Sequence, residues 1–420
     1  MDINRTTVYQ KINYILIVVL TFFIPVYKKI VPLIVALLLL NWLIQGDFKN
    51  KISKIVKNRF FAILFISLYL IYLIGLCYAK NLYGTADCKG GLFDIQVKLS
   101  LFVLPLILFT ISDNIFKKEK INTILSSYIL GCIVGSLICL GNAIYNFCKT
   151  NSYDYFYYTY LSVLHHPSYF AMFLAFAICI ILFWMIEKYN YLSIIKKIIL
   201  GLIVTYFIVF IMMLSSKAGI ISLIAIFIIE ILYLIIQKKK YFTAALSFLY
   251  IFLFLFIAIK ILPRSTIRLI SARNAIENKE DIKKNSSEST ADRILIWKSS
   301  IEIIKDNFLF GVGTGNVKDV LIEKYKEKQL SEPFNKRLNA HSQYLQTFIA
   351  VGITGFLILI LNLIIPAIYA FKRKNILYLF FIGIISINFL VESMLEVQDG
   401  VIFYAFFNSF LLLFTKKDFE

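Results

Sequence analysis

The chain has 420 residues, of which 60% are hydrophobic and 16% are charged. Soluble globular domains are roughly 45–50% apolar and about 25% charged, so the composition excludes a water-soluble fold and indicates a polytopic membrane protein. The formal net charge of +19 does not indicate a nucleic-acid partner, because the lysines and arginines fall in short clusters between apolar runs. The six cysteines show no CxxC or metal-ligand spacing and say little about the compartment.

Apolar runs long enough to cross about 30 Å of hydrocarbon recur along the chain. The first follows Arg5 and Lys11 without a small-residue cleavage site, so we expect a retained span rather than a signal peptide. About twelve spans are predicted, near residues 12–27, 30–45, 60–78, 95–111, 121–147, 167–186, 194–214, 218–236, 241–262, 344–371, 375–391 and 400–415. The expected fold is therefore an all-α membrane bundle in three parts: membrane helices in 1–262, a long loop over 263–343, and membrane helices in 344–420.

The distribution of positive charge predicts the orientation. With the N-terminus in the cytoplasm, the cytoplasmic segments contain 21 Lys and Arg residues and the opposite short loops contain seven. This bias fits the positive-inside rule, although Lys28 and Lys29 on an outer loop run against it. Both termini are then cytoplasmic, and residues 263–343 lie outside with all three histidines. We therefore expect the polar chemistry on the external face.

Several polar features precede the long loop. The tyrosine-rich stretch 152–160 is typical of an aromatic belt at the membrane interface, and it could also supply stacking faces for sugar rings. His165 and His166 precede Pro167, which we expect to begin the sixth span. Adjacent side chains diverge and no third ligand is evident, which argues against a metal site. Lys217, at the start of the eighth span, either snorkels to the surface or binds an anion.

The long loop is expected to contain helices. Residues 263–292 read as a polar linker, and "VKDVLIEKYKEKQL" as a solvated helix. "FGVGTGN" at 310–316 is expected to be a tight turn between two loop helices, because no strand precedes it as a phosphate loop would need. An amphipathic helix lying in the membrane interface is predicted around Arg293, with an apolar stripe of Ile294, Trp297, Ile301, Ile304 and Phe308. Arg293 lies near that face, where it either anchors the helix to lipid phosphates or forms part of a functional site.

His341 lies at the start of the tenth span, where Asn339 or Ser342 can cap the helix. One interpretation is a histidine satisfied by headgroups or backbone. The other is a general base, because a helix N-terminus disfavours imidazolium and a base must be neutral. Glu392 and Glu396 are expected on one helical face, solvated or bonded to the basic groups of this side.

Three stretches carry a resemblance to a known family. They are "SSKAGIISLI", "RILIWKSSIEIIKDNFLFGVGTGN" and "NAHSQYLQTFIAVGITGFLILI", in this order over about the last 210 residues. Together they resemble the O-antigen ligase family, which also covers O-antigen polymerase-like proteins and bacterial protein O-oligosaccharyltransferases. "HHPSYFAMFLAFAI" and "ESMLEVQDGVIFYAFF" are similar to versions from Bacteroidetes-type bacteria. The first 150 residues match only as generic spans.

The resemblance implies a GT-C-like bundle in the bacterial inner membrane with a periplasmic active site. It implies transfer of a glycan from undecaprenyl diphosphate to an acceptor hydroxyl, which for the ligases is a sugar of the lipid A core, without cofactor or metal. His341 matches the family's essential loop histidine, and Arg293 and Lys217 match its phosphate-binding positions. The family more often has Arg where this chain has Lys217. Candidate contacts for the acceptor or glycan are His165, His166, Tyr344, Glu392 and Glu396.

Two groups of alternatives stay open at this point. A polymerase or a protein O-oligosaccharyltransferase would use the same chemistry on another acceptor, and nothing in the sequence fixes the acceptor. A polysaccharide transporter is the alternative from another class, since many transporters have about twelve spans. Transporters place ionisable residues within their spans and show inverted repeats, whereas this chain has nearly charge-free spans and no evident internal repeat.

Overall fold

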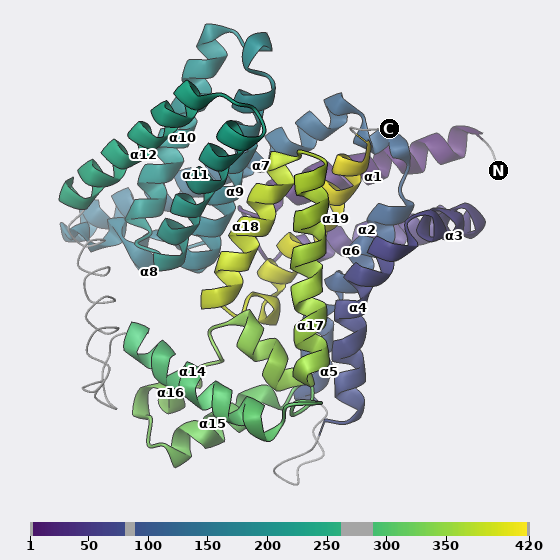
Figure 1. Cartoon of the computed structure of the whole chain (residues 1–420), viewed down its shortest axis with the longest axis vertical. Coiled ribbons are helices and arrows are strands. Elements are labelled where there is room, and N and C mark those ends of the chain that lie inside the picture. Colours follow the sequence, from purple (N-terminus) through teal and green to yellow (C-terminus); the bar gives the residue numbers. More distant parts are fainter. Residues whose placement is uncertain (1–2, 80–88, 262–288, 418–420) are drawn as a thin grey trace.

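The structure, a computed structural model, describes residues 3–79, 89–261 and 289–417, and every regular element in these residues is a helix (Figure 1). The N-terminal helices are α1 (Ile3–Phe23), α2 (Val31–Ile44), α3 (Phe48–Lys57), α4 (Arg59–Cys77), α5 (Lys89–Lys98), α6 (Ser100–Thr110) and α7 (Lys118–Thr150). The middle ones are α8 (Tyr158–Leu161), α9 (Pro167–Glu187), α10 (Ile194–Met213), α11 (Lys217–Ile236) and α12 (Tyr241–Ile261). The last are α14 (Ser289–Asp306), α15 (Val317–Glu327), α16 (Ser331–Asn335), α17 (Gln343–Lys372), α18 (Ile376–Val391) and α19 (Gln398–Lys417). Short 3₁₀ helices are η1 (Asp113–Phe116), η2 (Tyr153–Phe156), η3 (Tyr189–Tyr191) and η4 (Met394–Glu396).

Each predicted span coincides with at least one helix. Among the described residues, eight helices are long and apolar enough to cross a membrane, and a ninth span results if α2 and α3, bent by 113°, count as one. The apolar parts of α1, α12 and α18 are shorter than a full span. The predicted total of about twelve therefore stays a prediction, as does the periplasmic position of residues 263–343, of which 263–288 lie outside the described residues.

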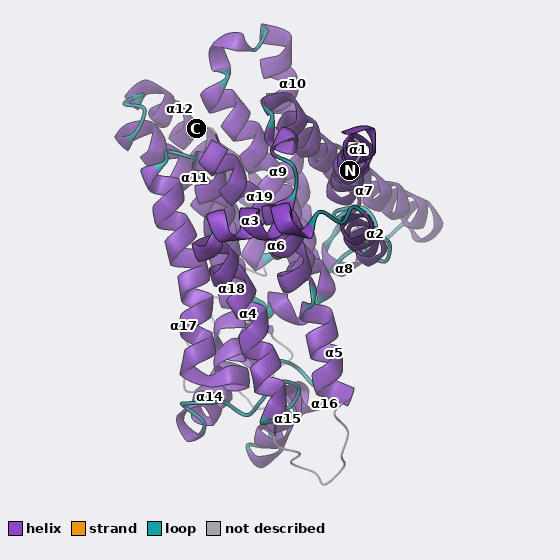
Figure 2. Ribbon diagram, turned by 90° about the vertical axis from the view of Figure 1, so that its right-hand side faces the viewer, coloured by secondary structure: helices purple, strands orange, loops and turns teal. Residues whose placement is uncertain are grey.

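The centre of the bundle is formed by α9, α18 and α19. Aromatic rings from these helices interlock there, with Phe176 and Phe407 centroids 4.7 Å apart and Phe381 and Phe403 centroids 5.7 Å apart. Lipid tails are as apolar as leucine side chains, so membrane helices gain no hydrophobic stabilisation when they associate. Close packing of this kind is a main interaction that holds them together. The start of α1 and the end of α19 lie at the opposite end of the molecule from α14–α16 in both views (Figure 1, Figure 2). The charge distribution predicts that both termini lie on one side and the loop helices on the other, as the structure has them. That the side with the loop helices is periplasmic stays a prediction.

The glycine-rich stretch 310–316 is a turn between α14 and α15, as predicted. It also docks against a break in α17. Backbone N–H groups of Val312 and Gly313 donate to the carbonyls of Ile349 and Ala350 at 2.8 and 2.9 Å, just before the break at Val351 and Gly352. In return Ile353 N–H donates to the Phe308 carbonyl at 3.0 Å. The loop helices are thereby fixed to a membrane helix.

Gly352→Ala is expected to destabilise the protein by about 2–4 kcal/mol. Gly352 has a φ of +67°, and a Cβ there would lie 2.2 Å from the backbone oxygen of Leu309. No side-chain rotation can relieve a contact with backbone. The measurement is the midpoint of thermal unfolding in detergent. Gly141→Ala is the matched control, because its Cβ meets nothing within 4 Å and it lies within α7. Equal midpoints for the two variants would contradict this prediction.

Candidate active site

A pocket of about 200 Å³ lies where the starts of α9 and α11 meet α14 and the segment that precedes α17. We call it the His341 pocket. The residues that line it are Tyr158, His166, Ser168, Ser216, Lys217, Ala218, Asp292, Arg293, Ile296, Lys336, Leu338 and His341. Three residues singled out in the sequence, His341, Arg293 and Lys217, therefore share one cavity although they belong to different elements.

His341 lies two residues before α17 in a strained conformation. Its φ is +45°, in the left-handed region that costs an ordinary residue of the order of 1–3 kcal/mol. Its backbone N–H donates to Asn339 Oδ1 at 3.0 Å. Ser342 occupies the N-cap position without a side-chain cap bond, and its hydroxyl donates to the Phe389 carbonyl at 3.3 Å. The predicted cap is therefore absent, and these side chains instead fix the turn that carries the imidazole.

Glu392 links the imidazole to the guanidinium. Its Oε1 accepts hydrogen bonds from Arg293 Nη2 at 2.9 Å and from the Ser168 hydroxyl at 3.0 Å. Its Oε2 lies 3.5 Å from His341 Nδ1. Burial raises the pKa of Glu392, but the contact with His341 and the charge of Arg293 outweigh burial and lower the pKa to about 2. The carboxylate is therefore ionised at neutral pH and faces Nδ1 of the ring.

This lowered pKa predicts how stability depends on pH. Because the folded-state pKa of about 2 lies below the ordinary value of 4.5, the stabilisation from ionised Glu392 is present above pH 4.5 and is lost as the pH falls towards 2. We expect the unfolding midpoints of wild type and Glu392→Gln to differ by a constant amount between pH 7 and about pH 5. The difference should shrink below pH 4.5. A difference that grows on acidification would contradict the assignment.

Two helix N-termini converge on the pocket. Lys217 is the first residue of α11, where the Ser216 hydroxyl accepts the Gly219 N–H at 3.2 Å. His166 caps α9, with Nδ1 accepting the Ser168 N–H at 3.4 Å. Helix N-termini favour anions, and the cationic side chains of Lys217, Arg293 and Lys336 add positive charge to the pocket. The carboxylates of Asp292 in the lining and Glu392 behind it offset part of this positive charge. The arrangement is suited to a bound anion.

Three candidate contacts lie elsewhere. His165 is buried, and its Nδ1 lies 3.1 Å from Asp399 Oδ2 between α9 and α19. Glu396 pairs with buried Lys98 at 2.8 Å. The Tyr344 hydroxyl donates to the Ser386 carbonyl at 3.2 Å. None of these side chains lines the His341 pocket, and their contact with the glycan or acceptor stays a prediction.

The structure differs from two predictions about which residues share one face of a helix. Glu392 and Glu396 do not share a helical face, because α18 ends at Val391 and a short 3₁₀ turn follows. The carboxylates then face different partners. In α14, the buried residues include Ile296 and Ile303, whereas Ile301 of the predicted stripe is 46% exposed. The reason is that α14 packs against α17 and α15. The residues of α14 that face these two helices are the buried ones.

Sequence reasoning missed other residues of the site. Ser168 and Lys336 were not singled out, since a serine after His-His-Pro and a lysine in a solvated loop give no local signal. Glu392 was expected to be solvated, bonded to basic groups of this side or in contact with the glycan, and its specific link to His341 and Arg293 depends on tertiary structure. Among the described residues, no group of three or more His, Cys, Asp or Glu side chains is placed to hold a metal ion.

Comparison with known proteins places most of the pocket lining within a family domain. Residues 202–360 match the family described as O-antigen ligase. The match supports assignment of this segment of the chain to the O-antigen ligase family. An uncharacterised protein of Haemophilus influenzae is 30% identical over 132 residues, which are 29% of this chain and 33% of that protein. The chain therefore covers about a third of the relative it matches.

The O-antigen ligase domain contains Lys217, Arg293 and His341, whereas His166 and Glu392 lie outside residues 202–360. The pocket is thus completed by parts of the chain on both sides of the matched segment. The family and the apolar helices together describe a multi-pass membrane protein.

Proposed function

We propose that this O-antigen ligase family protein moves a glycan from undecaprenyl diphosphate to an acceptor hydroxyl on the periplasmic face of the bacterial inner membrane. The observation that carries the proposal is the His341 pocket, which combines an imidazole backed by a carboxylate with a cluster of cations. In this proposal residues 1–262 and 344–420 anchor the enzyme. The loop 263–343 brings Arg293 and His341 to the membrane surface.

His341 acts as the general base. With the Nδ1 proton directed at ionised Glu392, the other ring nitrogen, Nε2, is the proton acceptor. It takes the proton of the acceptor hydroxyl as that oxygen forms a bond to the anomeric carbon. The bond from this carbon to the diphosphate oxygen breaks at the same time, and undecaprenyl diphosphate leaves with the electron pair. Attack opposite the leaving group inverts the anomeric configuration.

The cations of the pocket stabilise the departing diphosphate. Its negative charge increases as the glycosidic bond breaks, and fixed donors aimed at that charge lower the barrier. Arg293 can present further N–H donors besides the one that bonds Glu392, whereas Lys217 acts as a point charge. A diphosphate is a stable anion, so the proposed mechanism uses neither an acid catalyst nor a metal or other cofactor.

Lys217→Ala should weaken donor binding by roughly tenfold to hundredfold, since a charge-assisted hydrogen bond contributes roughly 1.5–3 kcal/mol. The measurement is the affinity for undecaprenyl diphosphate in detergent micelles. Lys149→Ala is the control, because this exposed lysine at the end of α7 is placed on the same face by charge distribution but does not line the pocket. Equal affinities for Lys217→Ala and wild type would remove Lys217 from the phosphate site.

The acceptor is proposed to be the lipid A core, as for an O-antigen ligase. The test is transfer in vitro from lipid-linked glycan to lipid A core, with EDTA present. Glycan-capped core formed by wild type and not by His341→Ala supports the proposal. Extension of the lipid-linked glycan would indicate a polymerase, and labelling of Ser or Thr in a protein would indicate an O-oligosaccharyltransferase. Movement of the glycan across vesicles without transfer would indicate a transporter and overturn the proposal.

A further inference from the structure

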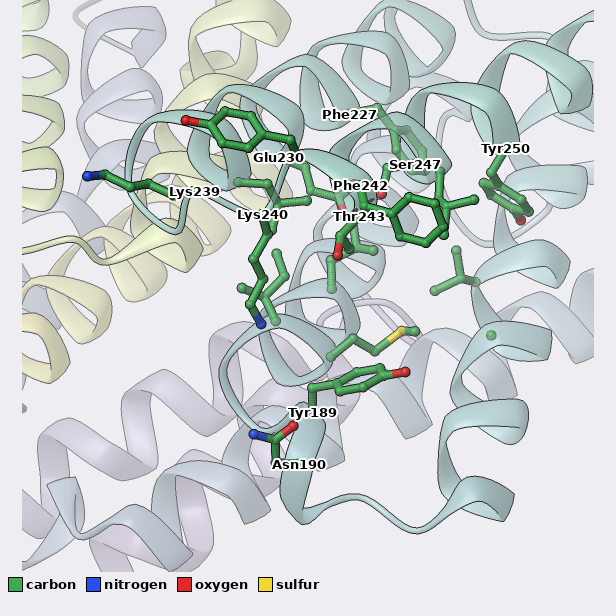
Figure 3. Close-up of a pocket in the computed structure, with 18 of the residues that line it drawn as sticks. Tyr189, Asn190, Phe227, Glu230, Lys239, Lys240, Phe242, Thr243, Ser247 and Tyr250 are labelled. Atoms are coloured by element: carbon green, nitrogen blue, oxygen red, sulfur yellow. Dashed lines mark hydrogen bonds between the residues drawn. The ribbon is translucent and has the colours of Figure 1, made fainter.

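A second and larger cavity lies between α10 and α12, with α11 as its back wall (Figure 3). Its volume is about 1130 Å³, at the upper end of the roughly 300–1,000 Å³ typical of small-molecule sites. The two helices meet where Thr205 Oγ1 and Tyr250 OH are 3.0 Å apart, and the cavity separates them towards the start of α12. Glu230 in its wall is 13 residues after Lys217 on α11, or about 20 Å along the helix axis. The two cavities are therefore distinct.

The cavity contains a buried carboxyl group that lacks a complete set of partners. Glu230 is 4% exposed, and its Oε1 accepts a hydrogen bond from the Ser247 hydroxyl at 3.2 Å. Its Oε2 is buried and has no hydrogen-bond partner among the described residues. An unsatisfied polar atom in an apolar environment costs several kcal/mol, and ionisable groups at membrane depth are rarely without a purpose. The partner of Glu230, Ser247, lines the same cavity and is partly exposed, so a ligand with a polar group at this depth can hydrogen-bond to the Ser247–Glu230 pair.

The polarity of the cavity wall changes with depth. Lys239 and Lys240 lie at its mouth, in the turn from α11 to α12, and both are exposed. Figure 3 shows the Lys240 side chain extending across the mouth towards Asn190. Neighbouring Lys238 instead pairs with Glu187 at 2.9 Å.

Behind the two lysines come Glu230 and Ser247, which can exchange hydrogen bonds with a ligand. Phe227, Val204 and Tyr250 line the wall farther from the mouth. The charged side chains therefore lie at the mouth and the hydrogen-bonding pair behind them, in a wall that is otherwise mostly apolar.

This order matches a phospholipid, whose phosphate, ester groups and acyl chains follow one another in the same sequence. We propose that the cavity is a binding site for an anionic phospholipid of the leaflet opposite the His341 pocket. The phosphate lies at Lys240, with Lys239 adding positive charge beside the mouth, while the ester region lies at Glu230 and Ser247 and the acyl chains lie against Phe227 and Tyr250. Basic residues at the membrane surface attract anionic lipid, which favours this occupant over a second copy of the chain. The proposal does not depend on the glycosyl transfer.

The test is native mass spectrometry of the full chain in mild detergent, with phosphatidylglycerol or diacylglycerol added. Wild type should retain phosphatidylglycerol and not diacylglycerol, because only the former carries a phosphate. The double variant Lys239→Ala/Lys240→Ala should reduce retention by roughly tenfold to thirtyfold, since each surface lysine contributes about fivefold in affinity. Lys117→Ala/Lys118→Ala is the matched control, since these adjacent exposed lysines lie at the start of α7 outside the cavity.

A second pair of variants tests the apolar part. Leu246→Trp should fill the cavity and abolish retention, whereas Leu249→Trp should leave it intact, because Leu249 is similarly exposed on the same helix but does not line the cavity. Equal retention of both lipids, or equal loss in the lysine variant and its control, would overturn the proposal. So would a dimer that Leu246→Trp disrupts, which would assign this face to a second copy of the chain. Both lysine variants change exposed residues, so loss of folding does not obscure the result.

Discussion

His341→Ala is expected to lower the rate of glycan transfer by about 10²–10⁴-fold while the donor still binds. The imidazole is the proposed proton acceptor, and the cations that hold the diphosphate belong to other residues of the pocket. Removal of the base should therefore reduce kcat and leave the affinity for the lipid-linked donor nearly unchanged. The measurement is single-turnover transfer together with donor binding in the same detergent.

Tyr344→Phe is the control for this variant. The Tyr344 hydroxyl donates to the Ser386 carbonyl outside the His341 pocket, so its loss should leave transfer within a few-fold of wild type. Equal loss of donor binding and turnover in His341→Ala would assign His341 a positioning role instead of base catalysis. Unchanged turnover would exclude both roles.

Glu392→Gln is expected to reduce turnover by a comparable factor without removing any group that touches the substrate. The carboxylate faces His341 Nδ1 at 3.5 Å and favours the tautomer in which Nδ1 carries the proton. An amide can instead donate its own N–H to Nδ1, which would move the ring proton to Nε2 and block the base. The loss should appear in kcat rather than in KM, and it should alter the dependence of kcat on pH.

Glu396→Gln provides the matched comparison for Glu392→Gln. Glu396 makes its ion pair with Lys98, away from the His341 pocket, so its loss can lower stability but should preserve the pH profile of transfer. A Glu392→Gln enzyme whose pH profile matches wild type would show that the carboxylate only stabilises the fold. Arg293 would then be its principal partner, through the 2.9 Å contact.

The positions of the membrane helices could be predicted from the sequence because hydrophobic length is a local property. Pro167 begins α9 and the glycines at 311, 313 and 315 form the turn between α14 and α15, as expected from the backbone preferences of these residues. The grouping of His341, Arg293 and Lys217 also followed from the resemblance and the charge distribution. These features depend on residue type and chain order.

The partners of the acidic residues could not be predicted in the same way. The direction of Glu392 depends on where α18 ends, and a helical periodicity extended by one turn would place it beside Glu396. The buried side of α14 depends on its contact with α17, which links distant parts of the chain. The directions of His165 and His166 diverge as expected, but only the tertiary structure shows which of them faces the pocket.

The break in α17 at Val351 and Gly352 has a consequence for the length of the chain between it and His341. The glycine-rich turn holds the helix at this break, and the imidazole lies before the first residue of the same helix. One inserted residue rotates an α-helix by about 100° about its axis. An insertion or deletion within residues 343–350 would therefore rotate the base away from Glu392, so the number of residues in this stretch is fixed by the geometry of the site.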